Sequence, residues 1–475
     1  MILALNNNFG QYGSYFLVGA GGAGMSAIAI VLKGMGYKVA GSDIKESRYT
    51  SSLKKEGIKI FTGHDRKNIS GADILVYSAA IPESNVEIQE ARAKNIPVHS
   101  RADILSWILN KSRGIAIAGT HGKTTTTSMV SMMLRGLDMD PTIIVGGELN
   151  ELGSNAIYGK SDFVIAEACE SDGSFLKYRP FISVVTNIDE DHFDYYNNMD
   201  ELQKSFLEFI SNTKEEGWII INGDEIDKSQ IQDMGKKQII TFGLDKNNDI
   251  TASNIQYCTL GSSYDLSIKR KYGFETKSPA SSGKAEVLRV QLNVPGLHNI
   301  KNSLAAFCVC FAMGLDRARA AEVLKYFTGV KRRFEKRGEK NGAIIFDDYA
   351  HHPSEVKATL EAAAEEKMQR IITVFQPHRY SRLAHLKNEF SLCFDTADIL
   401  VITDVYGSGE QPIPGINGKI LIDSLIENGF SGKLAYIPGL SDIPGYLDME
   451  MRHGDIVLLM GAGDITRVTD ELFRD

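Results

Sequence analysis

Short runs of apolar residues recur along the chain, and each run leads through a glycine-rich or polar turn into a stretch with helical spacing. In the first third of the chain the apolar runs lie at 15–18, 37–40, 58–61 and 74–77. Short apolar runs bounded by turn residues are typical of strands buried in a sheet, and intervening helices indicate parallel pairing. We therefore predict a strand at each run, in an alternation that continues to about Trp107.

The alternation starts again near residue 114 and once more near residue 343. The strands predicted in these two later parts lie at 115–118, 162–166, 182–186, 343–346, 371–375, 398–402 and 455–460. We predict three α/β domains over residues 1–107, 108–329 and 330–475, each with a mainly parallel, doubly wound sheet. A β-rich stretch at 245–295 predicts a small antiparallel β excursion with an exposed loop in the second domain. An apolar helix is expected to follow at 303–313.

Composition narrows the kind of protein. The 475 residues exceed one ordinary domain, and 43% hydrophobic with 24% charged residues is typical of a soluble chain. A formal net charge of −8 and one short basic cluster at 331–337 argue against nucleic acid as a partner. The uncharged segment 15–32 is about as long as a minimal membrane span, but its clustered glycines predict a strand, a turn and a helix. Without a signal peptide, we expect a cytoplasmic protein that does not bind membranes.

The chain has five cysteines: Cys169, Cys258, Cys308, Cys310 and Cys393. Their number is odd, and their spacing matches neither a metal site nor a disulfide framework. We expect reduced thiols, chiefly in the core.

The richest chemistry follows the strand at 115–118, where Gly119-Thr-His-Gly-Lys-Thr opens a hydroxyl-rich helix. Glycines let backbone N–H groups approach phosphate oxygens, a helix N-terminus favours anions, and a lysine can reach the terminal phosphates. A threonine hydroxyl there can hold Mg²⁺. Ile117 stands where the standard pattern has glycine, so this is a variant loop in a domain that resembles P-loop ATPases.

A second glycine turn, Gly19-Ala-Gly-Gly-Ala-Gly24, lies between the first strand and its helix, and the next strand ends at Ser42-Asp43. This is the pattern of a Rossmann-like nucleotide-binding half, in which the acidic residue bonds a sugar or base. The pattern alone leaves a dinucleotide cofactor and another nucleotide ligand open. The turn that begins at Ser78 is another expected ligand edge.

Two acidic clusters follow the central strands, at 167–172 and 187–192. Residues just past the ends of parallel strands share one edge with the phosphate loop, so the acidic residues of both clusters and His192 are candidate Mg²⁺ ligands. In the third domain, which we also expect to be Rossmann-like, His351, His378 and two arginines form a cationic set suited to a carboxylate or phosphate. Asn299 and Asn302 lie three apart, a spacing that places two amides on one helix face.

Taken in order, seven motifs resemble those of the Mur ligases of bacterial cell-wall synthesis, over essentially the whole chain. They are Gly-Thr-His-Gly-Lys-Thr-Thr, Glu-Ala-Cys-Glu-Ser-Asp, Asn-Ile-Asp-Glu-Asp-His, His-Asn-Ile-Lys-Asn, Arg-Arg-Phe, Asp-Asp-Tyr-Ala-His-His-Pro and Pro-His-Arg. The resemblance is closest to the branch of the family that joins L-alanine to UDP-N-acetylmuramate. A recycling ligase that attaches a tripeptide to the same sugar nucleotide shares several motifs and is the alternative.

The resemblance implies an ATP-dependent ligase of peptidoglycan synthesis, and through it a role in cell shape and division. It assigns the first glycine turn to the UDP-sugar instead of a dinucleotide. The implied partners are UDP-N-acetylmuramate, ATP, L-alanine and Mg²⁺, two ions for which Mn²⁺ can substitute. We expect no nucleic-acid or membrane partner, and a monomer or weak homodimer.

Site residues carry over position by position. The implied catalytic residues are Lys123, Glu167 and His192, and the metal ligands are Thr124, Glu167 and His192. The ATP-binding set is Gly119, Thr120, His121, Gly122, Lys123, Thr124, Thr125, Asn299, Asn302, Arg333 and Asp348. The UDP-sugar set is Gly21, Gly22, Ala23, Gly24, Met25, Ser26, Ser42, Asp43, His64, Ser78 and Arg101. The amino-acid set is Tyr349, His351, His378, Arg379 and Arg382.

Two positions depart from the family pattern. Cys169 stands where the family commonly has aspartate, and we expect the change to be tolerated. Other branches use a carbamylated lysine about fifteen residues after the histidine, where this chain has Phe206-Leu207-Glu208. We therefore expect no carbamylation.

Overall fold

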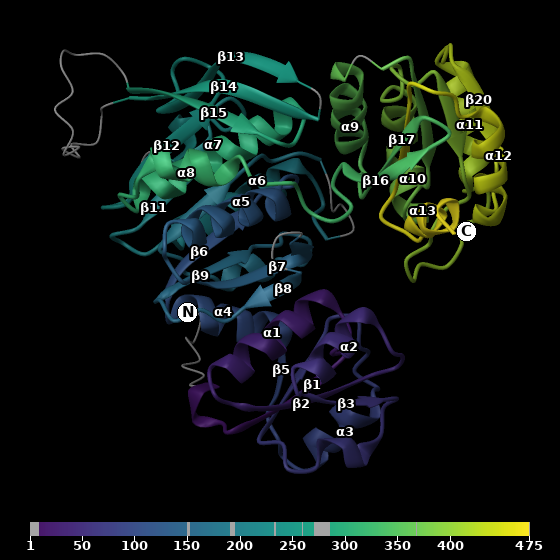
Figure 1. Ribbon diagram of the computed structural model, residues 1–475. Coiled ribbons are helices and arrows are strands. Elements are labelled where there is room, and N and C mark those ends of the chain that lie inside the picture. Colours follow the sequence, from purple (N-terminus) through teal and green to yellow (C-terminus); the bar gives the residue numbers. More distant parts are fainter. Residues whose placement is uncertain are drawn as a thin grey trace. The chain divides into compact units, whose positions relative to one another are not determined.

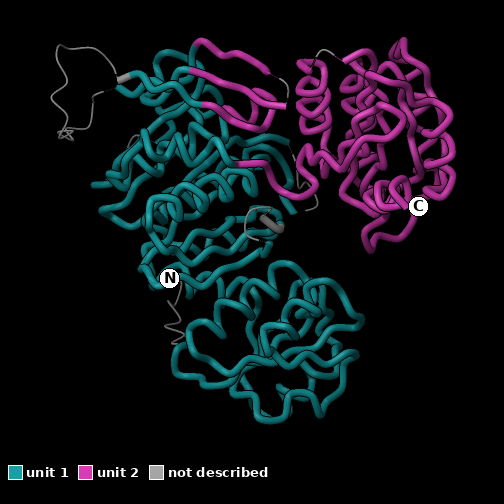
Figure 2. Tube along the Cα trace, viewed as in Figure 1, with its two compact units in different colours: residues 1–253, 265–290, 301–326 teal, residues 254–264, 291–300, 327–475 magenta. Residues whose placement is uncertain are grey.

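The computed structural model describes residues 9–149, 153–190, 195–231, 234–258, 260–269, 286–366 and 368–474. The chain forms two compact units (Figure 2). Unit 1 comprises Met1–Ser253, Asp265–Val290 and Lys301–Tyr326, and unit 2 comprises Asn254–Tyr264, Gln291–Ile300 and Phe327–Asp475. The strands form three sheets of five, ten and six strands.

The first sheet has the order β3-β2-β1-β4-β5 and is parallel throughout (Figure 1). Its strands are β1 Ser14–Val18, β2 Lys38–Asp43, β3 Lys59–Thr62, β4 Ile74–Tyr77 and β5 Val98–Ser100, and its helices are α1 Ala23–Gly34, α2 Arg48–Lys55, α3 Val86–Ala93 and α4 Arg101–Asn110. All four predicted strands are confirmed. The strand order reverses between β1 and β4, which is where open α/β sheets bind ligands.

The second sheet has the order β15-β14-β13-β12-β11-β10-β6-β9-β7-β8. Its strands are β6 Arg113–Ala118, β7 Thr142–Leu149, β8 Ser154–Ile157, β9 Phe163–Glu167, β10 Ile182–Val185, β11 Trp218–Asn222, β12 Gln238–Gly243, β13 Ile250–Cys258, β14 Gly261–Ile268 and β15 Glu286–Leu292. The helices are α5 Lys123–Gly136, α6 Met199–Ser211, α7 Leu297–Ala312 and α8 Arg317–Leu324. β6 pairs in parallel with β9 on one side and β10 on the other.

The β-rich stretch predicted at 245–295 contains β13, β14 and β15, which continue the central sheet. β12 pairs in parallel with β13 through Phe242 and Ile250, and β14 and β15 follow in the same sheet. The alternating apolar positions of β14 are buried, so these strands have a core to cover and extend the central sheet. Helix α7 begins at Leu297, directly after the turn at Gly296, which has a φ of 89°, so Asn299 and Asn302 lie on a helix as predicted.

The third sheet has the order β16-β17-β21-β18-β19-β20. Its strands are β16 Glu335–Lys340, β17 Ala343–Asp348, β18 Arg370–Phe375, β19 Ile399–Ile402, β20 Lys433–Tyr436 and β21 Asp455–Met460, and its helices are α9 Pro353–Glu365, α10 Tyr380–Ser391, α11 Gly418–Glu427, α12 Ile443–Glu450 and α13 Thr466–Leu472. Two separate apolar clusters pack on the sheet, one containing Phe375 and Leu400 and the other Val374 and Val401. Alternate residues of the central strands thus face opposite clusters, as in a doubly wound sheet.

Short 3-10 helices lie at Phe9–Gln11, Arg66–Ile69, Ser174–Lys177, Lys228–Ile231 and Leu440–Asp442. All five cysteines are unpaired by disulfide, and Cys308, Cys310 and Cys393 are buried as predicted, whereas Cys258 is exposed. The uncharged segment 15–32 folds as β1, a turn and α1, as predicted. Among the described residues, no helix is both long and apolar enough to cross a membrane.

Candidate functional site

The loop between β6 and α5 has a backbone that only glycine can supply at two positions. Gly119 has a φ of 136°, and a Cβ there would lie 2.0 Å from Oγ1 of Thr186. Gly122 caps α5 with a φ of 78°, and a Cβ there would lie 2.4 Å from Oδ1 of Asn302. Side chains are thus excluded from both turns of the loop, which leaves its backbone open to a close ligand.

The same loop is fastened to the segment that leaves β10. The N–H of His121 donates to Oδ1 of Asn187 at 2.7 Å, and the carbonyl of His121 accepts from Thr186 at 2.6 Å and from the Asn187 amide at 3.0 Å. The Asp189 N–H donates to Oγ1 of Thr120 at 2.9 Å. The predicted acidic cluster at 187–192 therefore holds the phosphate loop in shape through Asn187 and Asp189.

Lys123, the first residue of α5, has its ammonium group inside the loop. Its Nζ lies 2.9 Å from Oε1 of Glu170 and 2.9 Å from the carbonyl of Thr120, and it also donates to the carbonyl of Gly119. Burial lowers the pKa of Lys123, but the charge and hydrogen bond of Glu170, together with the nearby Cys169 and Glu167, outweigh burial and raise the pKa above its ordinary value. The lysine is therefore charged and pre-positioned. Glu170 belongs to the acidic cluster predicted at 167–172, and it contacts the loop lysine instead of standing free as a metal ligand.

Three more predicted residues of the central domain lie around this loop. Glu167 ends β9, next to β6, and its Oε1 accepts the N–H of Gly146 at 2.9 Å. Thr124 is half-buried in the first turn of α5. Asn302 accepts a hydrogen bond from Thr126 at 3.2 Å, so α7 contacts the loop helix. A carboxylate and a hydroxyl are oxygen donors of the kind Mg²⁺ binds. His192 lies outside the described residues.

The glycine turn after β1 is held by the end of β2. The N–H groups of Gly19 and Ala20 both donate to the carbonyl of Ser42 at 2.9 Å, and the N–H of Gly21 donates to Oδ2 of Asp43 at 2.8 Å. The Arg101 guanidinium covers Gly24, where a Cβ would lie 2.7 Å from Nη1. Asp43 and Arg101 therefore both lie at the glycine turn.

Three residues predicted for the UDP-sugar are turned inward. Met25 and Ser26 are buried in α1, and the Ser26 hydroxyl donates to the carbonyl of Ala23 at 2.9 Å. The Ser42 side chain is fully buried and its hydroxyl donates to Glu87 at 2.6 Å. These three side chains pack inside the domain and support the turn. Residues that are at least partly exposed in the turn are Gly21, Gly22, Ala23 and Gly24. His64 and Ser78 are half-buried at the same edge of the sheet.

In unit 2, Arg333 and Asp348 are neighbours in a charged cluster. Arg333 lies 3.3 Å from Oε1 of Glu355, a residue that sequence reasoning missed. Asp348 accepts the N–H groups of Phe334 and Ala350, each at 2.6 Å, and so fixes the turn that carries Arg333. Burial raises the pKa of Asp348 to about 6, although the Arg333 charge and the two backbone donors lower it. Asn299, also in unit 2, donates to the carbonyl of Pro295 at 2.7 Å.

The predicted amino-acid residues of unit 2 form one continuous cluster. The rings of His351 and His378 lie 5.6 Å apart, and Tyr349 lies 5.2 Å from His351. Nη1 of Arg382 lies 3.2 Å from Nδ1 of His378. Arg379 precedes α10 with a φ of 67°, a left-handed conformation that is rare outside glycine and is often found at functional sites.

Two further contacts define the chemistry of this cluster. Tyr406, which sequence reasoning missed, stacks on His378 with ring centres 5.9 Å apart. Burial lowers the pKa of His351 to about 4, although Glu355 raises it. Nδ1 of His351 lies 2.8 Å from the carbonyl of Tyr349, so this nitrogen carries the proton of the neutral ring. The cluster thus offers two arginine charges, which suit a carboxylate, beside His351, whose neutral ring adds no further positive charge.

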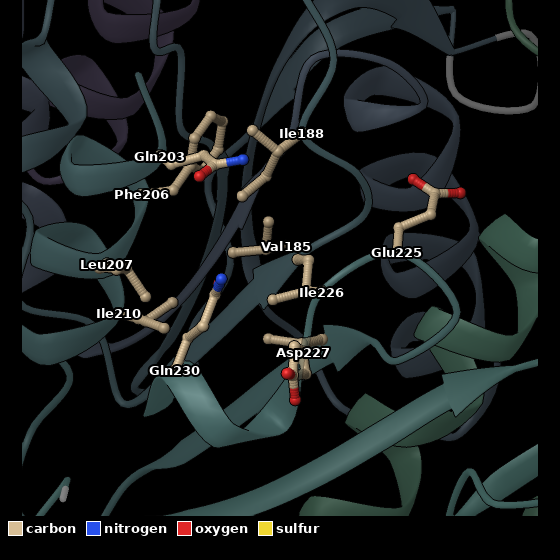
Figure 3. A pocket seen from close by; sticks show the side chains of 11 residues that line it. Val185, Ile188, Gln203, Phe206, Leu207, Ile210, Glu225, Ile226, Asp227 and Gln230 are labelled. Carbon is tan, nitrogen blue, oxygen red and sulfur yellow. The ribbon is translucent and has the colours of Figure 1, made fainter. Parts of the chain in front are cut away.

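A cavity in the central domain, apart from these clusters, lies between α6 and the ends of β10 and β11 (Figure 3). Its lining is mostly apolar and comprises Val185, Ile188, Gln203, Phe206, Leu207, Ile210, Ile221, Glu225, Ile226, Asp227 and Gln230. None of these residues is in the predicted site sets. Ile188, however, lies between Asn187 and Asp189, which bond the phosphate loop.

The protein combines three sheets covered by helices with a glycine-lysine loop and a separate arginine-histidine cluster. These are features of an enzyme that uses a nucleoside triphosphate. Comparison with known protein families identifies the class of enzyme. The Mur ligase family catalytic domain matches residues 15–113, the Mur ligase middle domain matches 117–310, and the Mur ligase glutamate ligase domain matches 332–463. The chain belongs to the Mur ligase family and is a ligase.

The sequence is similar to those of individual ligases over nearly the full length of the chain. The chain is 42% identical to the UDP-N-acetylmuramate–L-alanine ligase of Pelotomaculum thermopropionicum, covering 96% of each chain. It is also 42% identical to the ligase of the same name from Rubrobacter xylanophilus, covering 96% of this chain and 98% of that one.

Solved structures share the fold. The UDP-N-acetylmuramate-alanine ligase of Thermotoga maritima superposes with a TM-score of 0.78 at 29% identity, covering 97% of this chain and 98% of that one. A murein peptide ligase from Psychrobacter arcticus superposes with a TM-score of 0.68 at 21% identity over 97% of this chain and 98% of that one, which shows the common fold alone.

Proposed function

We propose that the protein joins L-alanine to the lactyl carboxylate of UDP-N-acetylmuramate at the expense of ATP, giving UDP-N-acetylmuramoyl-L-alanine, ADP and phosphate. The observation that carries the proposal is the Lys123 ammonium group, buried against Glu170 inside a loop that excludes side chains at Gly119 and Gly122. Relatives of the same full length that are 42% identical are named for this reaction.

The chemistry requires two transfers. The substrate carboxylate attacks the γ-phosphorus of ATP, which forms an acyl phosphate and releases ADP. The alanine amine then attacks the acyl carbon, and the tetrahedral intermediate expels phosphate to leave an amide. Both steps concentrate negative charge on phosphoryl or acyl oxygens, so a fixed cation such as Lys123 stabilises the transition states.

For ATP we propose contacts with the loop and with polar residues of α7 and β17. The set is Gly119, Thr120, His121, Gly122, Lys123, Thr124, Thr125, Asn299, Asn302, Arg333 and Asp348. Thr124, Glu167 and His192 are the proposed Mg²⁺ ligands. When bound, Mg²⁺ neutralises phosphate charge and orients the phosphoryl group; two ions and replacement by Mn²⁺ are part of the proposal.

For the UDP-sugar we propose the glycine turn with Asp43, His64, Ser78 and Arg101, supported from within by Met25, Ser26 and Ser42. For L-alanine we propose the unit 2 cluster of Tyr349, His351, His378, Arg379 and Arg382. An arginine pairs with the carboxylate of alanine in this arrangement, because two guanidinium N–H groups match two carboxylate oxygens.

A product assay tests the proposal. The purified protein receives UDP-N-acetylmuramate, ATP and Mg²⁺ with L-alanine, L-serine, glycine or the stem tripeptide, and the products are separated and weighed by mass spectrometry. We expect the highest kcat/KM with L-alanine. A higher kcat/KM with the tripeptide would establish a recycling ligase instead. Nucleotide binding without any amide product would indicate an ATP-binding switch without ligase activity.

The setting of the activity is also part of the proposal. We propose that the protein works in the bacterial cytoplasm, in peptidoglycan synthesis, as a monomer or weak homodimer. Light scattering after size-exclusion chromatography, at several protein concentrations, measures the oligomeric state. A stable assembly larger than a dimer would contradict it.

A further inference from the structure

The N-terminal domain contains a fully buried carboxylate that the sequence pattern did not single out. Glu87 lies in the first turn of α3 and its side chain has no exposed surface. Its Oε2 accepts from the Ser42 hydroxyl at 2.6 Å and lies 2.7 Å from Nδ1 of His64. Its Oε1 accepts from the Asn68 amide at 2.7 Å and, at 3.4 Å, from the N–H of Asp65.

The surroundings of Glu87 determine where the proton on His64 lies. The Asn68 amide nitrogen and the Asp65 N–H can only donate, so Oε1 must be an acceptor. The Ser42 hydroxyl donates to Oε2, and the remaining close neighbour of Oε2 is Nδ1 of His64. An ionised Glu87 satisfies all four contacts only when Nδ1 carries a hydrogen, and a buried carboxylate is stable only when it is surrounded in this way.

The cluster is built into the edge of the sheet that carries the glycine turn. Ser42, which donates to Glu87, accepts the N–H groups of Gly19 and Ala20 through its carbonyl. Gly63, which precedes His64, donates to the carbonyl of Asp43 at 2.7 Å. His64 therefore lies at the carboxyl ends of β2 and β3 with 17% of its side chain exposed, beside the turn.

We propose that Glu87 is a positioning residue of the UDP-sugar subsite, which fixes the Nδ1–H form of His64 and the orientation of its ring so that Nε2 faces the bound nucleotide sugar. The inference rests on the proposed function, because the UDP-sugar is the ligand of this edge. Glu87 acts through His64 and does not itself reach the ligand. Ser42 bonds to the same carboxylate through its hydroxyl and to the glycine turn through its carbonyl. Glu87 therefore supports both His64 and the glycine turn.

The first test reads the protonation of His64 directly in the wild-type protein, with one variant used only for assignment. In protein labelled with ¹⁵N-histidine, long-range ¹H–¹⁵N correlation spectra distinguish a protonated from an unprotonated Nδ1, and His64→Ala assigns the signal among the ten histidines. We expect Nδ1 of His64 to be protonated in the protein without ligand. A neutral ring with the hydrogen on Nε2 alone would overturn the proposal.

The second test exchanges the carboxylate for an amide of the same shape. In Glu87→Gln the amide oxygen can still accept from Asn68, but the amide nitrogen faces His64 and donates to Nδ1, which moves the ring hydrogen to Nε2. We expect the KM for UDP-N-acetylmuramate to rise about 10-fold or more, with kcat and the KM for ATP within about twofold, since one charge-assisted contact is worth about that factor. Glu90→Gln, on the same helix but paired with Lys94, is the matched control and should change neither constant.

A double variant separates positioning from simple support of the fold. If Glu87 acts through His64, Glu87→Gln should add less than about twofold to the KM effect of His64→Ala, whereas independent effects multiply. Full multiplication of the two effects would refute positioning through His64. A wild-type protein that fails to bind UDP-N-acetylmuramate in calorimetry would instead contradict the proposed function, a result distinct from an unchanged KM in Glu87→Gln.

Discussion

Nζ of Lys123 and Oε1 of Glu170 lie 2.9 Å apart, and the Glu170 side chain is fully buried. The pair spans two strand ends of the central sheet, since Lys123 begins α5 after β6 and Glu170 follows β9. Removing two charges from water is costly unless each compensates the other. The ammonium group is thereby held in the phosphate loop, where it donates to the carbonyls of Gly119 and Thr120 as well as to Glu170.

Replacing Lys123 by alanine should therefore abolish most turnover. We expect Lys123→Ala to lower kcat by at least roughly 10²-fold, as loss of a charge contact made in the transition state typically does. Steady-state release of phosphate measures the effect. Lys177→Ala, which removes an exposed lysine paired with Asp103, is the control and should leave kcat unchanged. Near-normal turnover in Lys123→Ala would contradict the assigned role.

Gly122 should tolerate no side chain. Gly122→Ala places a Cβ 2.4 Å from Oδ1 of Asn302 and forces alanine to a φ of 78°. The left-handed backbone alone costs about 1–2 kcal/mol, and we expect nucleotide affinity to fall below detection in calorimetry. The double variant Gly122→Ala with Asn302→Ala relieves the clash but keeps the strained φ. Because Asn302 is itself a proposed ATP contact, the double variant is compared with Asn302→Ala alone: it should stay weaker than that variant, and equal affinity of the two would show that the clash alone matters.

The strands and the phosphate loop could be predicted from the sequence because their signals are local. Apolar runs such as 343–346 mark buried strands, and Gly119 to Thr124 determines its own turn and helix start. The central sheet was harder, because the joining of β13 to β12 depends on pairing between segments whose patterns do not specify a partner.

The roles of the supporting carboxylates could not be predicted for a related reason. Glu87 and Glu355 are single acidic residues in segments with the pattern of ordinary surface, and only tertiary packing shows that they are buried or paired. The cluster that contains Glu170 is evident from the sequence, but its pairing with Lys123 is not. Ser42 illustrates the reverse case. It follows the ligand-binding pattern, yet the fold turns its side chain inward to Glu87.

Arg382 is expected to recognise the carboxylate of alanine. Its Nη1 lies 3.2 Å from Nδ1 of His378, which orients the guanidinium group. Arg382→Lys keeps the charge but loses the paired N–H geometry, so we expect the KM for L-alanine to rise about 10-fold while the KM for ATP stays unchanged. Initial rates over an alanine titration measure this. An equal rise in both constants would indicate a disturbed fold instead of a lost contact.

Asp348 should make the protein less stable as the pH rises. Burial raises the pKa of Asp348 to about 6 in the folded protein, above its ordinary value of 3.8. The folded state then binds more protons between these values, so the free energy of unfolding falls by about 2 kcal/mol from pH 4 to pH 6, out of about 3 kcal/mol over the whole titration. Urea unfolding at several pH values measures it. In Asp348→Asn this decrease should disappear, and an unchanged slope would contradict the raised pKa.

His351 should have the opposite effect over nearly the same range. Burial lowers the pKa of His351 from 6.5 to about 4, so the unfolded state binds more protons as the pH falls below 6.5. The free energy of unfolding should therefore decrease by about 3 kcal/mol from pH 6.5 to pH 4 on account of this residue. His351→Asn keeps a donor for the Tyr349 carbonyl and removes the titration. We expect this variant to lose stability less steeply on acidification than the wild type, in the urea series that shows the reverse change for Asp348→Asn. The same slope in variant and wild type would mean that His351 is charged in the folded protein, and its neutral role beside the ammonium group of alanine would then be untenable.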